Sequence, residues 1–481
     1  METKEMQVLV RGHPEEILIA IFQHAVSSSQ FRIQTAVHLG GVSNRWRNLV
    51  LGLADLWEWI DCRHPSLMEL CIERARARLL SFRASIPLSM SEGRDIAFMG
   101  TILHHIHRVQ TLDIKSADER GILSVTLYPL RPAPHLITLD IRQCSLPNDM
   151  FNVRPPLLQH LALHSCMFEW QSLSHLHHLH HLSIRNPYTL VTASDFLGVL
   201  ALNPNLKSID IVSVFHQRGT YTGNPIILPE LETLYIYYEY CHDATILLRS
   251  LSFPHTAHVH LSLNENHPED HEEIFETLKQ SRIGSTWDAQ TIMVVLHDPW
   301  FYFKLVEHGN NLQTPLIEIG IASPGGLERL TLKLLTSTHF LRLESLDLDG
   351  EDLDSITLIP WITFGNLPKL RILKVRNGFA LSFLEFVQME GRDGYGTPSF
   401  PHLRALLYED YRFDVEGFDA GLLQLAEYLQ CRCRMGVSVP SLTVVGLYRM
   451  SSEKEVMLAG FIQNLEHMIK RERYGREERV Y

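Results

Sequence analysis

The stretch Leu136–Ile141 reads LITLDI, and Leu158–Leu163 reads LQHLAL. Each of these six-residue units has apolar residues at its first, fourth and sixth positions. Similar units, some of them weaker, begin at Val109, Leu179, Leu206, Leu231, His258, Ile292, Leu316, Leu343, Leu370, Leu403 and Leu442. The first and last of the thirteen starts lie 333 residues apart, so the twelve steps average just under 28 residues. Apolar residues two positions apart predict a β-strand in every unit.

Segments between the units have the character of helices, as at Ser194–Leu200 and Ala244–Leu251. Prolines at positions 134, 204, 229, 368 and 440 precede a unit by two or three residues, where a proline ends a helix and straightens the chain. A period of about 20–29 residues with one strand per repeat is typical of leucine-rich repeats. Cys144 and Cys166 stand at the Asn/Cys position of that consensus.

These observations predict an α/β fold. We expect an irregular leucine-rich-repeat solenoid over residues 79–450, with parallel strands on the concave face and helices on the convex face. A linker helix is expected over residues 62–78. Residues 451–481 are expected to form a capping helix, Glu455–Lys470, and a charged tail.

The segment from His13 to Ile60 has apolar residues at helical spacing instead. A first predicted helix carries Ile17, Leu18, Ile21, Phe22 and Ala25 on one face. A second helical pattern follows Gly40-Gly41, and a short apolar third element covers Leu53–Ile60. Three helices in so few residues cannot bury all of these side chains, so the segment is expected to need a partner.

The order of these residues resembles the F-box: Pro14-x-Glu16-Ile17-Leu18-x-x-Ile21-Phe22, then Val42-Ser43-x-x-Trp46-x-x-Leu49, then Leu56-Trp57-x-x-Ile60. The resemblance implies a three-helix module over residues 12–61 that docks on the Skp-type adaptor of a cullin-based ubiquitin ligase. It implies adaptor contacts through nine residues: Pro14, Ile17, Leu18, Ile21, Phe22, Val42, Trp46, Leu49 and Trp57. The alternative is a helical cap that packs on the rest of the chain.

Composition limits the class of protein. Apolar residues make up 45% and charged residues 20%, which is typical of a globular protein. A net charge of -12 argues against general nucleic-acid binding. We find no secretory signal and no apolar run that could span a membrane, and seven scattered cysteines are typical of reduced thiols. A cytoplasmic or nuclear protein is therefore expected.

Motifs for catalysis are not apparent. In HLHHLHHL, at His175–Leu182, the leucines keep the repeat spacing, so we interpret the histidines as surface residues rather than metal ligands. Cys431-Arg432-Cys433 lacks the spacing of a zinc site, and the acids around Asp347 lack that of a calcium loop. We expect no metal, no cofactor and no catalytic residue, although a catalytic set assembled only in three dimensions stays open.

The expected function is therefore the substrate-recognition subunit of an SCF-type ubiquitin ligase. The alternative is a repeat scaffold that binds proteins without a ligase. Residues that alternate with the core leucines point out of the sheet, and Arg142, His164, Arg185, Tyr235 and Tyr237 are predicted to bind the target there. Their charge predicts an acidic or phosphorylated target segment. Target binding through the loops remains the other possibility.

Overall fold

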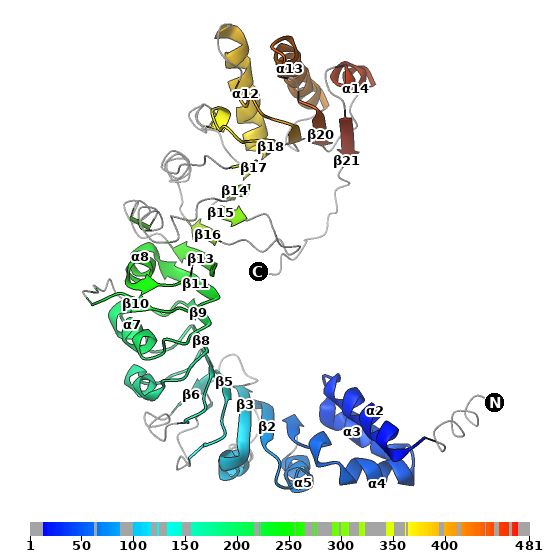
Figure 1. The fold of residues 1–481 in the computed structure, drawn as a ribbon, viewed down its shortest axis with the longest axis vertical. Coiled ribbons are helices and arrows are strands. Elements are labelled where there is room, and N and C mark those ends of the chain that lie inside the picture. Colours follow the sequence, from blue (N-terminus) through cyan, green and yellow to red (C-terminus); the bar gives the residue numbers. More distant parts are fainter. Residues whose placement is uncertain are drawn as a thin grey trace, which may run out of the picture. The chain divides into compact units, whose positions relative to one another are not determined.

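The computed structural model is a mixed α/β structure with a large, mostly parallel β-sheet (Figure 1). It describes residues 13–61, 65–86, 100–116, 123–124, 132–146, 155–215, 221, 223–254, 256–264, 273–274, 277, 291–297, 300–306, 317–322, 343–350, 361, 364–393, 399–410, 415–437, 439–446, 452–460 and 464–469. The chain divides into two compact units, Met1–Leu231 and Glu232–Tyr481, which are described separately.

Unit 1 begins with three α-helices, α2 (Glu15–Ser27), α3 (Arg32–Gly41) and α4 (Asn44–Gly52). Glu15 and Glu16 occupy the first turn of α2, where the helix dipole favours acidic side chains. Ser43 caps α4, because its hydroxyl accepts a hydrogen bond from the backbone N–H of Trp46 at 3.2 Å.

The structure differs from the N-terminal prediction in two places, a helix that was not predicted and a predicted helix that is absent from Leu53–Ile60. The sequence RIQTAVHLGG forms α3, which the pattern did not indicate because it buries only Ile33 and Ala36. The third predicted helix, Leu53–Ile60, is instead the 3₁₀ turn η1 (Ala54–Leu56) followed by strand β1 (Trp59–Asp61). The backbone of β1 finds hydrogen-bond partners in β2, with Trp59 beside Ser81, so the segment does not need a helix to satisfy its polar groups.

Seven parallel strands follow one another in chain order across unit 1: β1, β2 (Leu80–Ile86), β3 (Val109–Ser116), β5 (Thr138–Arg142), β7 (His160–His164), β8 (His181–Arg185) and β9 (Ser208–Val212). The shorter connecting elements are α5 (Pro65–Arg74), η2 (Ile106–Arg108), β4 (Leu123–Ser124), β6 (Cys144–Ser145), η3 (Trp170–His175), α7 (Ala193–Ala201) and β10 (Ile226–Ile227). Along each strand buried leucines and isoleucines alternate with residues of the opposite face, such as buried Leu139 and Ile141 around Asp140.

Successive strands of unit 1 end in the same way. Gln143, Ser165, Asn186 and Ser213 follow their strands with φ between +49° and +58°, a left-handed turn that leads the chain back into the core. Cys144 and Cys166 come next and are fully buried. The Cys166 thiol donates to the backbone oxygen of Ile141 at 3.2 Å, and burial raises its pKa to about 11. These cysteines therefore act as buried structural groups.

Unit 2 contains the strands β11 (Thr233–Tyr240), β13 (His258–Asn264), β14 (Thr291–His297), β15 (Trp300–Val306), β16 (Ile317–Ala322), β17 (Ser345–Gly350), β18 (Ile372–Asn377), β19 (Ala405–Asp410), β20 (Ser441–Gly446) and β21 (Asn464–Ile469), besides the short β12 (Leu251–Ser252). Its helices include α8 (Cys241–Ser250), α12 (Gly378–Asp393), α13 (Val415–Arg434) and α14 (Ser452–Ala459). Together the two units place a strand in each of the thirteen predicted repeats.

The expectation of uniformly parallel repeats was wrong in the middle of unit 2. There the strands lie side by side in the order β13, β16, β15, β14, β17, and β15 is antiparallel to both of its neighbours. β14 and β15 are separated by only two residues, and so short a connection allows only an antiparallel pair.

The predicted capping helix Glu455–Lys470 is also only partly helical. Helix α14 ends at Ala459, and Asn464–Ile469 forms β21, which pairs in parallel with β20. Gly460 interrupts the apolar helical pattern, and the edge of β20 offers backbone partners to an extended chain.

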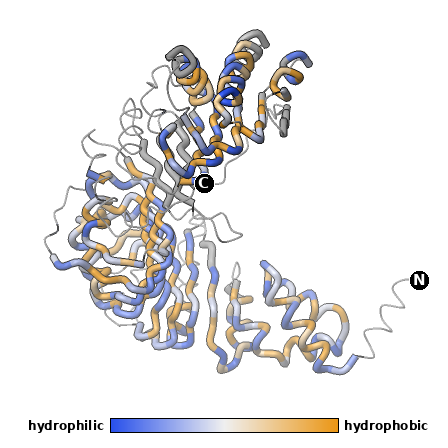
Figure 2. The backbone as a smooth tube through the Cα atoms, turned by 45° about the horizontal axis from the view of Figure 1, so that its top comes forward, coloured by the Kyte–Doolittle hydropathy of each residue, from blue (hydrophilic) through white to orange (hydrophobic). Residues whose placement is uncertain are grey.

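Helix α12 packs against β17, β18 and β19, and α13 packs against α12. Buried aromatic rings fill this part of unit 2, with Trp361 close to Phe364, Phe383 and Phe400. Figure 2 shows apolar residues, in orange, at intervals along the helices of the chain. Among the residues that the structure describes, no helix is long and apolar enough to cross a membrane.

Candidate functional site

The helices at the start of unit 1 leave an apolar stripe in contact with solvent. Pro14, Ile17 and Ile21 are spaced three and four residues apart and therefore share one side of α2. Ile17 and Ile21 are 49% and 48% exposed, and Val42, just before α4, is 57% exposed. Arg45 donates a hydrogen bond to the backbone oxygen of His13 at 2.9 Å, which holds the start of α4 next to the start of α2. We call Pro14, Ile17 and Ile21 the N-terminal apolar stripe.

The other residues predicted to touch an adaptor lie deeper. Leu18, Phe22 and Trp57 are at most 2% exposed, and Trp46 and Leu49 are half-buried. The rings of Phe22 and Trp46 pack with their centroids 4.7 Å apart. The indole N–H of Trp57 donates to the backbone oxygen of Val50 at 2.9 Å. Leu18, Phe22 and Trp57 therefore form the interior of the helical module in this structure, while their contact with an adaptor stays a prediction.

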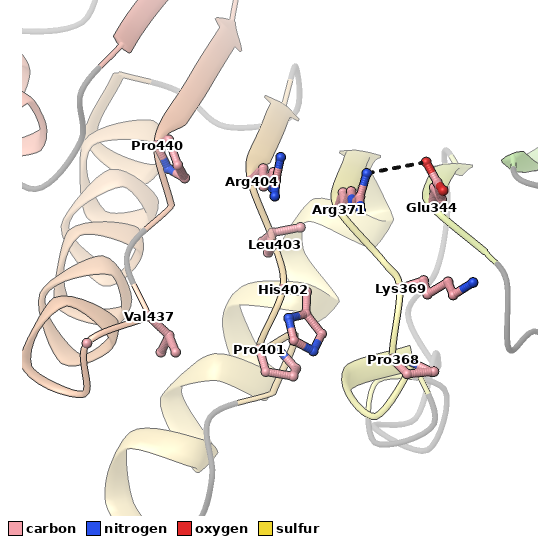
Figure 3. A pocket seen from close by; sticks show the side chains of 11 residues that line it. Glu344, Pro368, Lys369, Arg371, Pro401, His402, Leu403, Arg404, Val437 and Pro440 are labelled. Carbon is pink, nitrogen blue, oxygen red and sulfur yellow. Dashed lines mark ion pairs between the residues drawn. The ribbon is translucent and has the colours of Figure 1, made fainter.

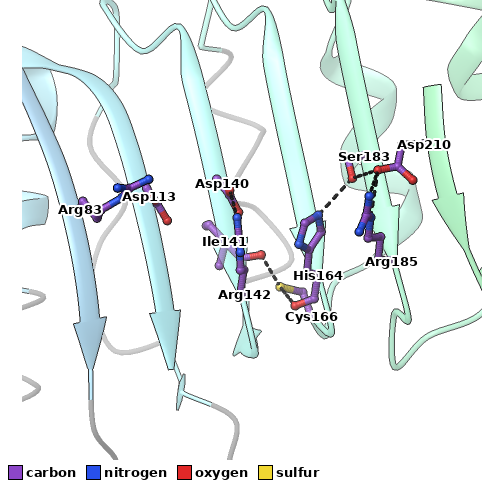
Figure 4. A network of polar contacts seen from close by, with 10 residues as sticks. All are labelled: Arg83, Asp113, Asp140, Ile141, Arg142, His164, Cys166, Ser183, Arg185 and Asp210. Atoms are coloured by element: carbon purple, nitrogen blue, oxygen red, sulfur yellow. Dashed lines mark hydrogen bonds and ion pairs between the residues drawn. The ribbon is translucent and has the colours of Figure 1, made fainter. Parts of the chain in front are cut away.

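A second candidate surface runs across the strands of unit 1, where arginines are paired with aspartates (Figure 4). Arg83 lies 2.7 Å from Asp113, measured from Nε to Oδ2. Arg142 makes two bonds to Asp140 of its own strand, at 3.0 and 2.6 Å. We call these two pairs, together with Arg185–Asp210, the Arg–Asp ladder.

The strand register explains the ladder. One cross-strand row contains Asp113, Asp140, Ala162, Ser183 and Asp210. The next row toward the strand ends contains Lys115, Arg142, His164, Arg185 and Val212. Arg142, His164 and Arg185 are thus brought together on adjacent strands, as the repeat spacing predicts. Because acidic residues of the first row lie beside basic residues of the second, the ion pairs Arg142–Asp140 and Arg185–Asp210 form between the rows.

His164 and Ser183 connect the two rows. The Nε2 atom of His164 lies 3.0 Å from the Ser183 hydroxyl, which donates to Asp210 Oδ2 at 3.1 Å. Burial lowers the pKa of His164, and the charges of Arg142 and Arg185 add to that effect against the opposing charges of Asp140 and Asp210. In the next row back, the rings of His160 and His181 are stacked 4.3 Å apart.

The ladder alters the prediction for target chemistry. Arg142 and Arg185 were expected to be available to an acidic or phosphorylated segment, but both guanidinium groups already contact a carboxylate. The sequence TLDIR could have predicted the contact between Asp140 and Arg142, because residues two apart on a strand lie on the same face. The sheet face of unit 1 is therefore a surface of mixed charge.

Tyr235 and Tyr237 lie on β11 of unit 2 and form a cluster with His260 of β13. The ring centroids are 6.1 Å apart between the two tyrosines and 4.8 Å apart between Tyr237 and His260. All three side chains are half-buried. His260 was not singled out from the sequence, but its unit HVHLSL places it on the same face of the sheet.

Unit 2 also contains a charge cluster around Asp347, whose acidic neighbours lack the spacing of a calcium loop. Arg376 lies 3.1 Å from Asp347, 3.8 Å from Asp349 and 3.3 Å from Glu409. Asp347 and Glu409 are only 6% and 7% exposed, and burial raises the pKa of Asp347. These charges therefore belong to a compact internal network.

Within the part of the chain that the structure describes, no group of three or more His, Cys, Asp or Glu side chains is arranged to hold a metal ion. Leu176, Leu179 and Leu182 of the histidine-rich segment are buried, while the neighbouring histidines are exposed or half-buried.

Comparison of the chain with known protein families finds no family model that matches. Comparison with characterised proteins finds no similar sequence.

Proposed function

We propose that the chain is the substrate-receptor subunit of an SCF-type ubiquitin ligase. Its N-terminal helices would bind a Skp-type adaptor and, through it, a cullin, while its strand-bearing repeats, of the leucine-rich type, would bind a target protein. The F-box-like order of residues from Pro14 to Ile60 supports this proposal. The receptor would carry out no bond chemistry and would act by holding a target lysine near the ubiquitin-loaded enzyme.

The single observation that carries the proposal is the N-terminal apolar stripe. Leu18 and Phe22 already close the interior of the helical module, yet Ile17 and Ile21 remain about half exposed on the same helix. Apolar side chains gathered on one surface of a small module indicate a contact with another protein. A closed interior also means that substitutions in the stripe change the surface without removing core contacts.

The decisive experiment is adaptor binding by the double variant Ile17→Asp/Ile21→Asp. Burying two carboxylates in an apolar interface should weaken binding by at least ~2–4 kcal/mol, about thirtyfold or more in Kd. Leu423→Asp is the matched control, because Leu423 is a 43% exposed apolar residue on another helix, α13. Titration calorimetry with a purified Skp-type adaptor measures the effect.

If the double variant and the wild type bind the adaptor with equal affinity, the adaptor contact does not lie on this side of α2. If the wild-type chain binds no adaptor, the ligase proposal is wrong, and the alternative of a repeat scaffold that binds proteins without a ligase takes its place. Circular dichroism of both variants checks that the helices are retained.

For the target, the cluster of Tyr235, Tyr237 and His260 is the stronger candidate, since aromatic side chains are frequent anchors of protein interfaces and the unit 1 arginines are paired. Tyr235→Ala/Tyr237→Ala should reduce target capture and leave adaptor binding unchanged. Tyr188→Ala is the control, because Tyr188 is an exposed tyrosine outside the cluster.

A further inference from the structure

A groove of about 560 Å³ lies at the starts of strands β18, β19 and β20 in unit 2 (Figure 3). Most of its lining comes from the three segments that lead into these strands, and each segment contributes a proline: Pro368, Pro401 and Pro440. Neither the adaptor contact nor the tyrosine cluster uses this surface. We call it the strand-start groove.

The strand-start groove is basic, although the whole chain has a net charge of -12. Lys369, Arg371 and Arg404 line it, together with His402, against a single carboxylate from Glu344. Arg371 and Glu344 are 3.9 Å apart, at the outer limit of an ion pair. In the part of the chain that the structure describes, Lys369 and Arg404 form no ion pair. The groove thus differs from the unit 1 sheet, where the arginines are neutralised.

The cations form an array and do not converge on one point. Arg371 and Arg404 stand directly before the paired residues Ile372 and Ala405, so they occupy equivalent places on neighbouring strands about 4.8 Å apart. Lys369 and His402 each lie two residues earlier, in the turns that lead into the two strands. An extended peptide likewise carries separate side chains along one face, so its carboxylates can pair with separate cations.

The backbone at the strand starts is already occupied. Three backbone N–H groups there donate to backbone oxygens of the neighbouring segment at 2.7 to 3.1 Å. The donors and acceptors are Arg371 to Glu344, Arg404 to Arg371 and Ser441 to Arg404. Sites for free phosphate commonly use such N–H groups as a cradle. At these three positions the side chains, and not the N–H groups, are left to bind an anion, which favours a partner with several separate charges over a small anion.

The groove is held in shape from inside. Arg432 of α13 is 1% exposed, and its guanidinium donates to the backbone oxygens of Phe400 at 2.8 Å and Val437 at 3.1 Å. Phe400 directly precedes Pro401, and Val437 is itself part of the lining. One buried side chain therefore fixes two walls, and a preformed surface lowers the entropy cost of binding.

We propose that the strand-start groove binds an extended acidic segment of a partner protein, with its carboxylates paired to Arg371, Arg404 and Lys369. The inference goes beyond adaptor and target binding as proposed above and does not depend on either. The negative charge of the remaining chain would repel acidic segments elsewhere and restrict them to this groove.

The test uses the full chain and a fluorescent peptide that alternates glutamate and serine, at low ionic strength. The groove variant is Lys369→Glu/Arg404→Glu, in which both side chains are exposed and unpaired, so folding should be unaffected. Lys207→Glu is a positional control in unit 1, because Lys207 directly precedes β9 as Arg371 precedes β18, although Lys207 lies 3.9 Å from Glu230. Fluorescence anisotropy should show a rise in Kd of about tenfold or more for the groove variant and no change for the control.

A peptide with glutamine in place of glutamate should not bind. Equal affinity of the groove variant and the wild type overturns the proposal, as does absence of binding by the wild type. Binding of inorganic phosphate without binding of the peptide overturns it in favour of a small-anion site. Ile17→Asp/Ile21→Asp should bind the peptide with wild-type affinity. The adaptor contact and the peptide contact are thereby tested separately.

Discussion

Arg185 of β8 donates a hydrogen bond to Asp210 of the next strand, with 2.9 Å between Nε and Oδ2. Arg142, in the equivalent place on β5, contacts Asp140 of its own strand. The difference has a local cause, because β8 carries Ser183 where β5 carries the aspartate. The arginine then turns to the nearest carboxylate, which lies one strand further on. Ser183 donates to the same oxygen and so connects His164 to the pair.

We expect His164 to make the stability of the protein depend on pH. Its pKa is lowered from 6.5 mainly by burial, so the folded protein binds fewer protons here than the unfolded chain. The neutral histidine therefore favours folding above the unfolded pKa of about 6.5, and this contribution is lost as the pH falls from there through the lower folded pKa. In the wild type, the urea concentration at the midpoint of unfolding should fall between about pH 7 and about pH 5. In His164→Gln this fall should be smaller. His178→Gln, at an exposed histidine, should retain it; equal slopes in the two variants would contradict this assignment.

Phe22→Ala should unfold the N-terminal helices rather than only remove an adaptor contact. Phe22 is fully buried against Trp46, and truncating a buried phenylalanine costs about 3–5 kcal/mol. A small helical module has little stability to spare. Limited proteolysis should show rapid cleavage between residues 13 and 52 in this variant, and not in Ile17→Asp/Ile21→Asp. Resistance to cleavage in Phe22→Ala would mean that the interior tolerates the cavity.

Arg376→Met should destabilise unit 2 strongly. Arg376 is shared by Asp347, Asp349 and Glu409, and removing a buried partner leaves uncompensated charge at a cost of about 3–5 kcal/mol. Lys374→Met is the comparison, because Lys374 is more exposed and lies 3.6 Å from Asp347, where a loss below about 1 kcal/mol is expected. Chemical unfolding measures both. Similar losses in the two variants would show that Arg376 is not the centre of the network.

Arg432→Met should lower the free energy of unfolding by about 3 kcal/mol or more, because it leaves buried backbone oxygens of Phe400 and Val437 without a donor. It should also weaken binding of the acidic peptide, since two walls of the strand-start groove lose their common support. Arg434→Met, two residues along the same helix at an exposed position, should change neither quantity. Wild-type stability in Arg432→Met would refute the supporting role.

The sequence by itself determined the strands of the thirteen repeat units and the two sides of the sheet there. Alternation such as Leu139, Asp140, Ile141, Arg142 is a local property, and it correctly separated buried from outward positions because strand side chains alternate at every residue. The same reasoning placed Arg142, His164 and Arg185 in one cross-strand row. It also identified α2, with Leu18 and Phe22 on its buried face.

Only the tertiary structure decided which strand lies beside which and which charges meet. Asp210 is 25 residues from Arg185, β15 enters the sheet antiparallel, and Asn464–Ile469 extends along β20 although its apolar spacing also fits a helix. Each outcome depends on hydrogen bonds and ion pairs between segments far apart in the chain, which no local pattern encodes. The exposure of Ile17 and Ile21 beside buried Phe22 also depends on tertiary packing. The neighbouring elements decide which apolar side chains of a helix are buried.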